Sequence, residues 1–245
     1  MPEIPDLENI TTVLNRNLPG LRIERVELLK PIVVRVARDE FEGRQRGVLL
    51  GRVRRQGKLL LFALESGDVL IVNAMLVGRF QYVEPSKKRH ARTCFALTLS
   101  DGRELRYVDQ RFTGKVYLVE MDALDTVPQL GEMDPDVLDP ALTEDAFLER
   151  LKPYRGQVKN VLVNAKFIAG IGNAYVDEIL FVAGVHPFTE VSDLDEERRR
   201  GLYRAIHEVL DWAIPIVAEE MGENTDKKPR GFLCVHRKGG EPCPA

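Results

Sequence analysis

The chain has 245 residues, 44% of them hydrophobic and 30% charged, with a formal net charge of −3. This ordinary globular composition argues against disorder, and the length suffices for one or two domains. No apolar run approaches the roughly 20 residues of a membrane span. The N-terminus carries acid where a secretory signal carries base. The three cysteines cannot build a disulfide framework, which favours a reducing compartment such as the cytoplasm.

The small net charge conceals a strong asymmetry along the chain. Residues 16–115 hold 21 Lys and Arg against 11 Asp and Glu, whereas residues 120–150 hold ten acidic residues and only one arginine. Residues 151–189 and 226–240 are again net positive. Local fields act over about 8 Å, so a positive face can coexist with an acidic total. These basic segments form either ordinary solvated surface or a face that binds nucleic acid.

The first residues predict a helix, and the next hundred predict strands. Leucine and isoleucine recur at helical spacing over residues 5–18, and Pro19-Gly20 ends that pattern. From 21 to 119 the apolar period changes to two, in short segments separated by glycine-containing turns, which is typical of an antiparallel sandwich or barrel. The expected strands cover residues 23–29, 32–37, 49–54, 59–64, 69–74, 80–83, 95–99, 105–108 and 116–118.

The second half of the chain returns to helical periodicity after a proline-containing linker at 122–142. Pro215 should bend or split the last helix. We therefore predict a multidomain protein that contains both α and β structure. An antiparallel β-sandwich with its N-terminal helix occupies residues 1–121, an all-α domain occupies 143–221, and a short appendage occupies 222–245. The expected helices of the all-α domain are 143–152, 155–166, 174–184 and 193–221.

The extreme N-terminus carries the first candidate for chemistry. Removal of Met1, expected before a small residue, leaves Pro2 with a secondary α-amine whose pKa is about 8, so part of it is neutral at pH 7. A neutral secondary amine attacks an aldehyde or hemiacetal carbon and forms an iminium. The Glu3 carboxylate lies next to this amine and can transfer protons to a sugar ring as it opens, and Asp6 is a second candidate for this proton transfer. The alternative is an ordinary helix start with acids that complement the helix dipole.

Two further segments suit the binding of an anion. Lys58 follows a glycine and opens an apolar strand, so it can project into a cleft, although most lysines are simply solvated. Gly170-Ile171-Gly172-Asn173 predicts a tight turn whose N–H groups begin the next helix and bind phosphate, with the Asn173 amide as a further donor. The helical surroundings exclude a dinucleotide-binding turn. A helix–turn–helix that holds a DNA backbone fits better.

The loop from Asp109 to Lys115 places Arg111 beside Phe112 at the end of the basic region. An arginine next to an aromatic ring suits a wedge that enters a duplex and contacts an orphaned base. Enzymes that extrude a base from the stack use such wedges. The alternative is a hairpin with one partly buried phenylalanine.

In order and spacing, these segments resemble the formamidopyrimidine-DNA glycosylase and endonuclease VIII family of base-excision repair enzymes. The resemblance covers essentially the whole chain and is strongest at Pro2-Glu3-Ile4-Pro5, Gln56-Gly57-Lys58, Ile168–Pro187 and Val235–Cys243. It implies a β-sandwich joined to a helix–two-turn–helix domain. The implied partner is double-stranded DNA with oxidised bases or abasic sites, and the implied state is a monomer in the cytoplasm, at the nucleoid of a prokaryotic-type cell.

The resemblance also implies roles for individual residues. Pro2 is expected to attack C1′ of the damaged nucleoside, and Glu3 to transfer the protons that open the sugar and assist elimination. Lys58 is expected to hold a phosphate near the lesion. Arg111 is expected to read the base opposite, and Asn173 to bind phosphate at the two-turn junction. The other expected DNA contacts are Lys166, Gly170 and Gly172.

Several positions depart from the family pattern. Asp6 stands where the family usually has glutamate, and Asn73 stands where it has histidine. Leu76 occupies the position of the inserted methionine, with Met75 beside it, and the aromatic Phe112 has moved by one position. The candidates for the apolar wedge are therefore Leu76, Met75 and Phe112.

The tail departs further. The short stretch Gly222–Gly231 leaves little room for the loop that caps flipped 8-oxoguanine, which favours oxidised pyrimidines or abasic sites as substrates. The zinc ribbon of many members needs four cysteines at paired spacing. Cys243 stands where the first would be, and Cys94 and Cys234 are unsuitable replacements. We expect no cofactor in this chain, and zinc only if a C-terminal ribbon is missing from the given sequence.

The main prediction is thus a DNA glycosylase with AP lyase activity that uses an N-terminal proline Schiff base and needs no metal. A lyase-only or non-catalytic relative that binds damaged or abasic DNA is the leading alternative, because the wedge and the tail are altered. A tautomerase with an N-terminal proline is a third class. It explains neither the basic β region nor the turn at Gly170–Asn173.

Overall fold

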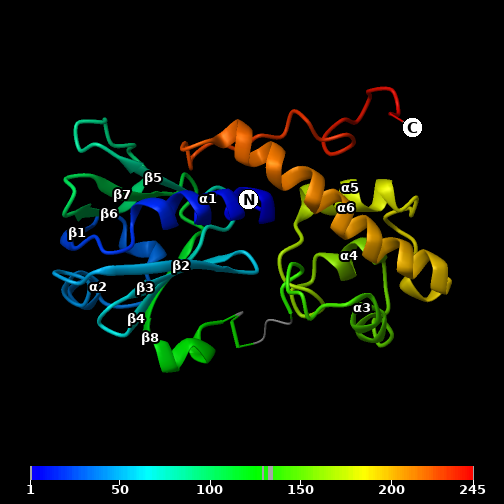
Figure 1. Cartoon of the computed structure of the whole chain (residues 1–245), viewed down its shortest axis with the longest axis horizontal. Coiled ribbons are helices and arrows are strands. Elements are labelled where there is room, and N and C mark those ends of the chain that lie inside the picture. Colours follow the sequence, from blue (N-terminus) through cyan, green and yellow to red (C-terminus); the bar gives the residue numbers. More distant parts are fainter. Residues whose placement is uncertain (1, 129, 132–134, 245) are drawn as a thin grey trace.

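The computed structural model describes residues 2–128, 130–131 and 135–244, which form a β lobe and a helical lobe (Figure 1). The N-terminal helix α1 (Ile4–Asn17) has a proline in its first turn, where the ring costs no hydrogen bond. Its apolar face, including Leu7, Ile10 and Leu14, is buried. Helix α1 packs against β2 on one side and against α6, from the far end of the chain, on the other.

The β lobe consists of two four-stranded antiparallel sheets, with strand orders β1-β6-β7-β5 and β2-β3-β4-β8. The apolar faces of both sheets enclose one core that includes Phe62, Phe80, Phe95 and Tyr107. The first sheet contains β1 (Ile23–Leu28), β5 (Arg79–Val83), β6 (Thr93–Leu99) and β7 (Glu104–Val108). The second contains β2 (Leu50–Gln56), β3 (Leu59–Leu64), β4 (Asp68–Asn73) and β8 (Lys115–Glu120).

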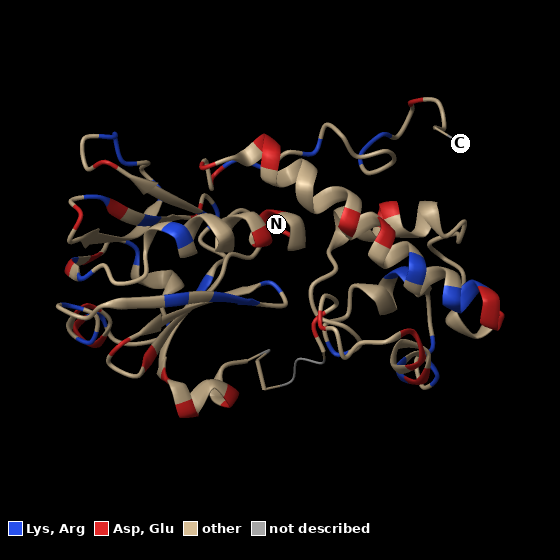
Figure 2. Cartoon of the chain, viewed as in Figure 1, with Lys and Arg blue, Asp and Glu red and all other residues tan. Residues whose placement is uncertain are grey.

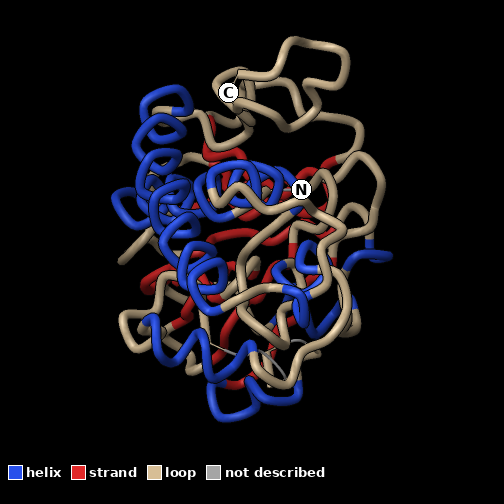
Figure 3. Tube along the Cα trace, turned by 90° about the vertical axis from the view of Figure 1, so that its right-hand side faces the viewer, coloured by secondary structure: helices blue, strands red, loops and turns tan. Residues whose placement is uncertain are grey.

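The helical lobe has its own core, in which Phe147, Phe167 and Tyr175 are fully buried. Figure 3 views the molecule from the right-hand side of Figure 1, and the helices of this lobe lie in front of the strands. No helix in the described ranges is both long and apolar enough to cross a membrane. The helices are α3 (Glu144–Leu151), α4 (Val158–Leu162), α5 (Asn173–Val182) and α6 (Glu196–Met221), with a short 3-10 turn η3 (Val191–Asp193).

The predicted fold class is confirmed, with three local corrections. Residues 32–37 do not form a strand: a 3-10 turn η1 (Pro31–Val33) and one isolated bridge at Val34 occupy the segment, followed by an unpredicted short helix α2 (Arg38–Gly43). Helix α6 runs through Pro215 without being split. The tail after α6 contains no helix or strand within the described part of the chain.

The segment predicted as a linker is partly folded. It begins with the 3-10 helix η2 (Met121–Thr126), and the apolar Val127, Val137 and Leu142 are buried. Residues 129 and 132–134 of the predicted linker lie outside the described residues. The next residues, Pro135 to Val137, pair with Ala169 of the helical lobe through two backbone hydrogen bonds. The end of this segment therefore belongs structurally to the helical lobe.

Candidate active site

Glu3 lies where the two lobes meet, at the start of α5. Its carboxylate accepts hydrogen bonds from the backbone N–H groups of Ala174 (3.2 Å) and Tyr175 (3.4 Å). Only 5% of the residue is exposed. Gly172, the residue just before α5, has no side chain that could cap this helix. The Glu3 carboxylate from the other lobe accepts these N–H groups in its place. The helix dipole favours a negative charge at this position.

Two glycines make room for this contact. A Cβ atom added at Gly172 would lie 2.3 Å from the Glu3 carboxyl carbon, and one at Gly170 would lie 2.4 Å from Cδ1 of Ile4. Gly170 also has a φ of +120°, a conformation that favours glycine. Both glycines are buried. The Gly-x-Gly turn directs two N–H groups of the following helix inward to Glu3. Its predicted contact with DNA phosphate stays a prediction.

Lys58 lies within electrostatic reach of Glu3, as the sequence predicts for two residues of one site. Burial lowers the pKa of the Lys58 ammonium, and the nearby Glu3 carboxylate opposes that shift. The strand register places Leu59 opposite Asn73, and Asn73 opposite Lys115. Lys58, Asn73 and Lys115 therefore lie at the same end of the second sheet. A cation such as Lys58 at this end suits a phosphate group.

Arg55 and Asp136, which the sequence reasoning missed, anchor the turn before Lys58. The Arg55 guanidinium binds both carboxylate oxygens of Asp136, at 2.5 and 2.7 Å, and also pairs with Glu8 of α1. Asp136 accepts a further hydrogen bond from the Gly57 N–H at 2.8 Å. The arginine side chain is only 6% exposed. The turn is therefore tied to the end of the linker segment that pairs with the helical lobe.

Pro2 is buried beside Glu3, and Asp6 holds the peptide group between them. Oδ2 of Asp6 accepts the Glu3 N–H at 2.8 Å. Both oxygens of Asp6 also bind the guanidinium of Arg230, a residue of the tail, at 2.9 and 2.5 Å. Asp6 is thus fully engaged, which suits a supporting role better than the proton transfer considered above. Arg230 was not identified from the sequence.

The predicted DNA contacts lie on both lobes. Asn173 and Lys166 are exposed in the helical lobe, and Arg111 is exposed in the β lobe. The Arg111 loop is shaped by the buried Asp109, which accepts the N–H groups of Arg111 and Gly114. In Figure 2, Lys and Arg recur along β2 in the β lobe, whereas Asp and Glu occur in η2.

The three wedge candidates differ in their surroundings. Leu76 is 45% exposed, whereas Met75 and Phe112 are half-buried. Phe112 packs against the sandwich core, and the Arg92 guanidinium lies 4.9 Å from its ring centroid. Met75 and Phe112 both have a positive φ, a strained state that often marks functional loops. Leu76 is therefore the candidate that presents apolar surface to solvent.

The loops that carry these residues meet at one buried side chain. The Tyr107 hydroxyl would lie 2.4 Å from a Cβ at Gly78 and 2.0 Å from a Cβ at Gly114. Gly78 closes the Met75–Leu76 loop, and Gly114 closes the Arg111–Phe112 loop. The two glycines let both loops approach the same tyrosine. The structure therefore brings together the two segments that the sequence predicts to act on the duplex.

The residues present do not fit a zinc site. In the described parts of the chain, no group of three or more His, Cys, Asp or Glu side chains is placed to hold a metal ion. Cys94 is buried in the β lobe, whereas Cys234 and Cys243 are exposed in the tail. A structural zinc ion takes four ligands. The prediction that zinc requires further residues stays a prediction.

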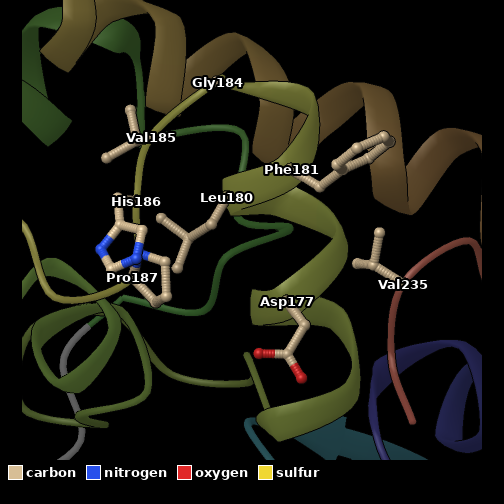
Figure 4. Close-up of a pocket in the computed structure, with 8 residues that line it drawn as sticks. All are labelled: Asp177, Leu180, Phe181, Gly184, Val185, His186, Pro187 and Val235. Carbon is tan, nitrogen blue, oxygen red and sulfur yellow. The ribbon is translucent and has the colours of Figure 1, made fainter. Parts of the chain in front are cut away.

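A cavity of about 500 Å³ opens on the helical lobe (Figure 4). The carboxylate of Asp177 and the ring of His186 are its polar groups, and the remaining lining is mostly apolar. None of Pro2, Glu3 and Lys58 lines it. The cavity is therefore separate from the candidate active site. Its apolar lining residues are Leu180, Phe181, Gly184, Val185, Pro187 and Val235.

Comparison with known proteins matches two parts of the chain to two family models. Residues 1–116 match the family model of the formamidopyrimidine-DNA glycosylase N-terminal domain, and residues 133–224 match the model of its H2TH domain. The chain belongs to the formamidopyrimidine-DNA glycosylase family. The formamidopyrimidine-DNA glycosylase of Desulforamulus reducens is 33% identical, over 100% of this chain and 91% of that protein. That of Pelotomaculum thermopropionicum is 32% identical with the same coverage.

Solved structures of formamidopyrimidine-DNA glycosylases share the fold. The Lactococcus lactis enzyme, in a complex with DNA containing an abasic site, superposes with a TM-score of 0.91 at 25% identity, over 99% of this chain and 91% of that chain. A family member bound to DNA with a carbocyclic 8-oxoguanine gives a TM-score of 0.90 at 26% identity and the same coverage. Family membership is thus supported by sequence and structure over nearly the full chain.

Proposed function

We propose that this protein is a base-excision repair glycosylase with AP lyase activity, which removes oxidised bases from double-stranded DNA. The observation that supports the proposal most strongly is the position of Glu3. Its carboxylate accepts two N–H groups at the N-terminus of α5, next to Pro2 and within electrostatic reach of Lys58. This arrangement combines an amine, a carboxylate and a buried cation. These are the groups that Schiff-base chemistry on a sugar phosphate requires.

The amine supplies the nucleophile. With Met1 removed, the lone pair of the Pro2 nitrogen forms a bond to C1′, and the electrons of the C1′–base bond leave with the base, which takes up a proton. Glu3 delivers a proton to the ring oxygen, so that the sugar opens and C1′ becomes an iminium carbon. Its burial against two N–H groups holds the carboxylate in one orientation. No metal is needed for these steps.

The iminium then permits strand cleavage. It acidifies the C2′ protons, and loss of one of them expels the 3′ phosphate by β-elimination. Lys58, at the same end of the second sheet as Asn73 and Lys115, is proposed to hold phosphate oxygens during this step. A second elimination at the 5′ side completes the sequence if the iminium persists. Hydrolysis of the iminium finally restores the Pro2 amine.

The relatives favour oxidised purines as substrates. The curated relatives are named for formamidopyrimidines, and one Lactococcus lactis structure holds DNA with a formamidopyrimidine derived from deoxyguanosine. The short tail predicts the opposite preference, for oxidised pyrimidines. We assign the formamidopyrimidine class first, because relatives over the full chain carry that name. Duplexes with a formamidopyrimidine, 8-oxoguanine, an oxidised pyrimidine or an abasic site test this order.

Borohydride trapping tests the proposed chemistry. Reduction of the iminium leaves a stable protein–DNA adduct, which we expect from a damaged-base duplex with the natural protein, with peptide mass analysis locating the adduct on Pro2. Glu3→Gln keeps an oxygen that accepts the two helix N–H groups but carries no transferable proton. We expect this variant to bind DNA and to release base at a strongly reduced rate. Intact mass verifies that Met1 has been removed.

The same experiment separates the alternatives. Adduct formation from abasic DNA alone indicates a lyase-only relative, and binding of abasic DNA without any adduct indicates a binding module. Either result overturns the glycosylase proposal. An adduct that peptide mass analysis locates on a residue other than Pro2 overturns the assignment of the nucleophile.

A further inference from the structure

The tail after α6 forms a strap across the β lobe before it reaches the N-terminus. We define the strap as residues 225–230. The Thr225 hydroxyl donates to the carbonyl of Phe80 at 2.8 Å, and the Gln81 amide donates to the Asp226 carboxylate at 2.6 Å. Arg79 donates to the Asp226 carbonyl at 2.8 Å. One end of the strap is thereby fixed along β5.

The other end of the strap reaches the catalytic N-terminus. Arg230 binds both oxygens of Asp6, whose side chain is only 1% exposed. The guanidinium also lies 5.5 Å from the ring centroid of the buried Tyr175. The backbone N–H of Tyr175 is one of the two that hold Glu3. Arg230 therefore contacts two of the residues that orient the Pro2–Glu3 pair, Asp6 and Tyr175.

The chain of contacts from Arg230 to Pro2 is short. The Glu3 N–H, which Asp6 accepts at 2.8 Å, belongs to the peptide group that follows the Pro2 α-carbon. A bidentate arginine fixes both the position and the rotation of a carboxylate. Fixing the Asp6 carboxylate fixes this peptide plane, and with it the direction of the Pro2 amine. Removal of Arg230 leaves a buried carboxylate without its cation, which is unfavourable.

We propose that Arg230 is a positioning residue for the N-terminal amine, acting through Asp6. The expected effect on the rate of adduct formation rests on the proposed function. The expected ordering of the N-terminus by Arg230 does not. A mispositioning of about 1 Å costs roughly 100-fold in rate. Loss of the pair therefore slows the attack on C1′ while the DNA-binding surface is retained.

The kinetic test measures single-turnover iminium formation and DNA affinity separately. We expect Arg230→Ala to slow borohydride-trapped adduct formation by 10- to 100-fold, roughly, and to change the Kd for abasic DNA by less than about threefold. Arg230→Lys keeps one charge without the paired geometry and should recover part of the rate. In Asp6→Asn, the further effect of Arg230→Ala should largely disappear, because the pair is already broken.

Arg16→Ala is the matched control. Arg16 also joins α1 to the segment after α6, through an exposed ion pair with Glu223 at 3.2 Å, but at the opposite end of α1. We expect its rate of adduct formation to equal that of the natural protein. Equal rates for Arg230→Ala and Arg16→Ala overturn the proposal. So does a fall in both rate and thermal stability that Arg230→Lys fails to relieve.

Hydrogen–deuterium exchange tests the structural part without any reaction. The amide of Glu3 should exchange faster in Arg230→Ala than in the natural protein, whereas it should be unchanged in Arg16→Ala. Unchanged exchange in Arg230→Ala overturns the positioning role. If the natural protein forms no adduct, the proposed function fails, but the exchange result still decides whether Arg230 orders the N-terminus.

Discussion

The carboxylate of Glu3 occupies the space that a side chain on Gly172 would need, with only 2.3 Å between the Glu3 carboxyl carbon and a Cβ built on the glycine. Real Cβ atoms essentially never approach so closely. The neighbours of Glu3 are backbone N–H groups of α5, which cannot retreat without moving the helix. The position of one catalytic candidate therefore depends on the absence of a side chain 169 positions later in the chain.

Gly172→Ala should displace Glu3 and lower the rate of base release by roughly 100-fold. Gly201 is the matched control, because it lies inside α6 with open space around its Cα. Gly201→Ala should keep full activity and gain up to about 1 kcal/mol in the free energy of unfolding, because alanine favours the helix. Single-turnover kinetics and urea unfolding of both variants provide the measurements. Full activity in Gly172→Ala would contradict the packing described here.

Lys58 predicts a particular dependence of stability on pH. Burial holds its folded pKa below the ordinary 10.5, despite the opposing effect of Glu3. At a pH between the folded pKa and 10.5, Lys58 is protonated in the unfolded chain but not in the folded chain. The free energy of unfolding therefore rises with pH in this window and falls again as pH drops through the folded pKa. Lys58→Met removes this penalty.

Urea unfolding from about pH 7 to about pH 10.5 checks this sign. The variant should be more stable than the natural protein at the lower end, and the difference should shrink as pH rises. A difference that grows with pH would show that Lys58 is charged and favourably paired. The loss of strand cleavage in Lys58→Met is a separate expectation, from its proposed contact with phosphate.

The ion pair between Arg55 and Asp136 should be worth far more than a surface pair. Asp136→Ala leaves the Arg55 guanidinium buried without its bidentate partner and removes the acceptor of the Gly57 N–H. We expect a loss of about 3 kcal/mol in the free energy of unfolding and slower strand cleavage, because the Lys58 turn is released. Glu223→Gln, at the exposed pair with Arg16, should cost less than about 1 kcal/mol. Equal effects would contradict the anchoring role.

The three cysteines should differ in reactivity. Cys94 is fully buried, and burial raises the pKa of its thiol to about 12. Cys234 and Cys243 are exposed. Because the thiolate is the reactive form, a disulfide reagent at neutral pH should modify two thiols in the folded protein and the third only after unfolding. Cys94→Ser should leave the native count unchanged; a fall to one would contradict the burial of Cys94.

The salt dependence of DNA binding should distinguish charge from hydrogen bonding. If phosphate contacts dominate, log K falls with log salt concentration by roughly 0.9 per contact. Lys166→Ala should reduce this slope by about one contact, whereas Asn173→Ala should weaken binding at every salt concentration and leave the slope unchanged. Fluorescence anisotropy with an abasic duplex measures both. A slope near zero in the natural protein would exclude a phosphate-binding face.

Periodicity predicted the architecture well because the strands are short apolar segments separated by turns. Strand β8 alternates between buried and more exposed residues, whereas β4 and β7 are buried throughout. The prediction failed at residues 32–37, which are rich in valine like a strand, but Pro31 starts a 3-10 turn and only Val34 bridges to β8. Of the two effects predicted for Pro215, a bend or a split, the structure excludes the split, because buried apolar residues of α6 lie on both sides of the proline.

The candidate site was predictable only where residue types are unusual in themselves. An N-terminal proline followed by glutamate, and a Gly-x-Gly turn, are visible in the sequence. Arg55, Asp136 and Arg230 resemble any other surface charges until the fold buries them. The glycines illustrate the same limit, because their spacing indicated a close approach but not that the approaching group would be Glu3.

The pairing of α1 with α6 joins the first and last helices of the chain. During synthesis, the residue proposed as nucleophile leaves the ribosome among the first, whereas α6 and Arg230 follow in the last fifth of the chain. Contacts between such distant parts of a chain form late in folding. A nascent or C-terminally shortened chain therefore carries the amine without the groups that orient it. Assembly of the candidate site therefore requires both ends of the described chain.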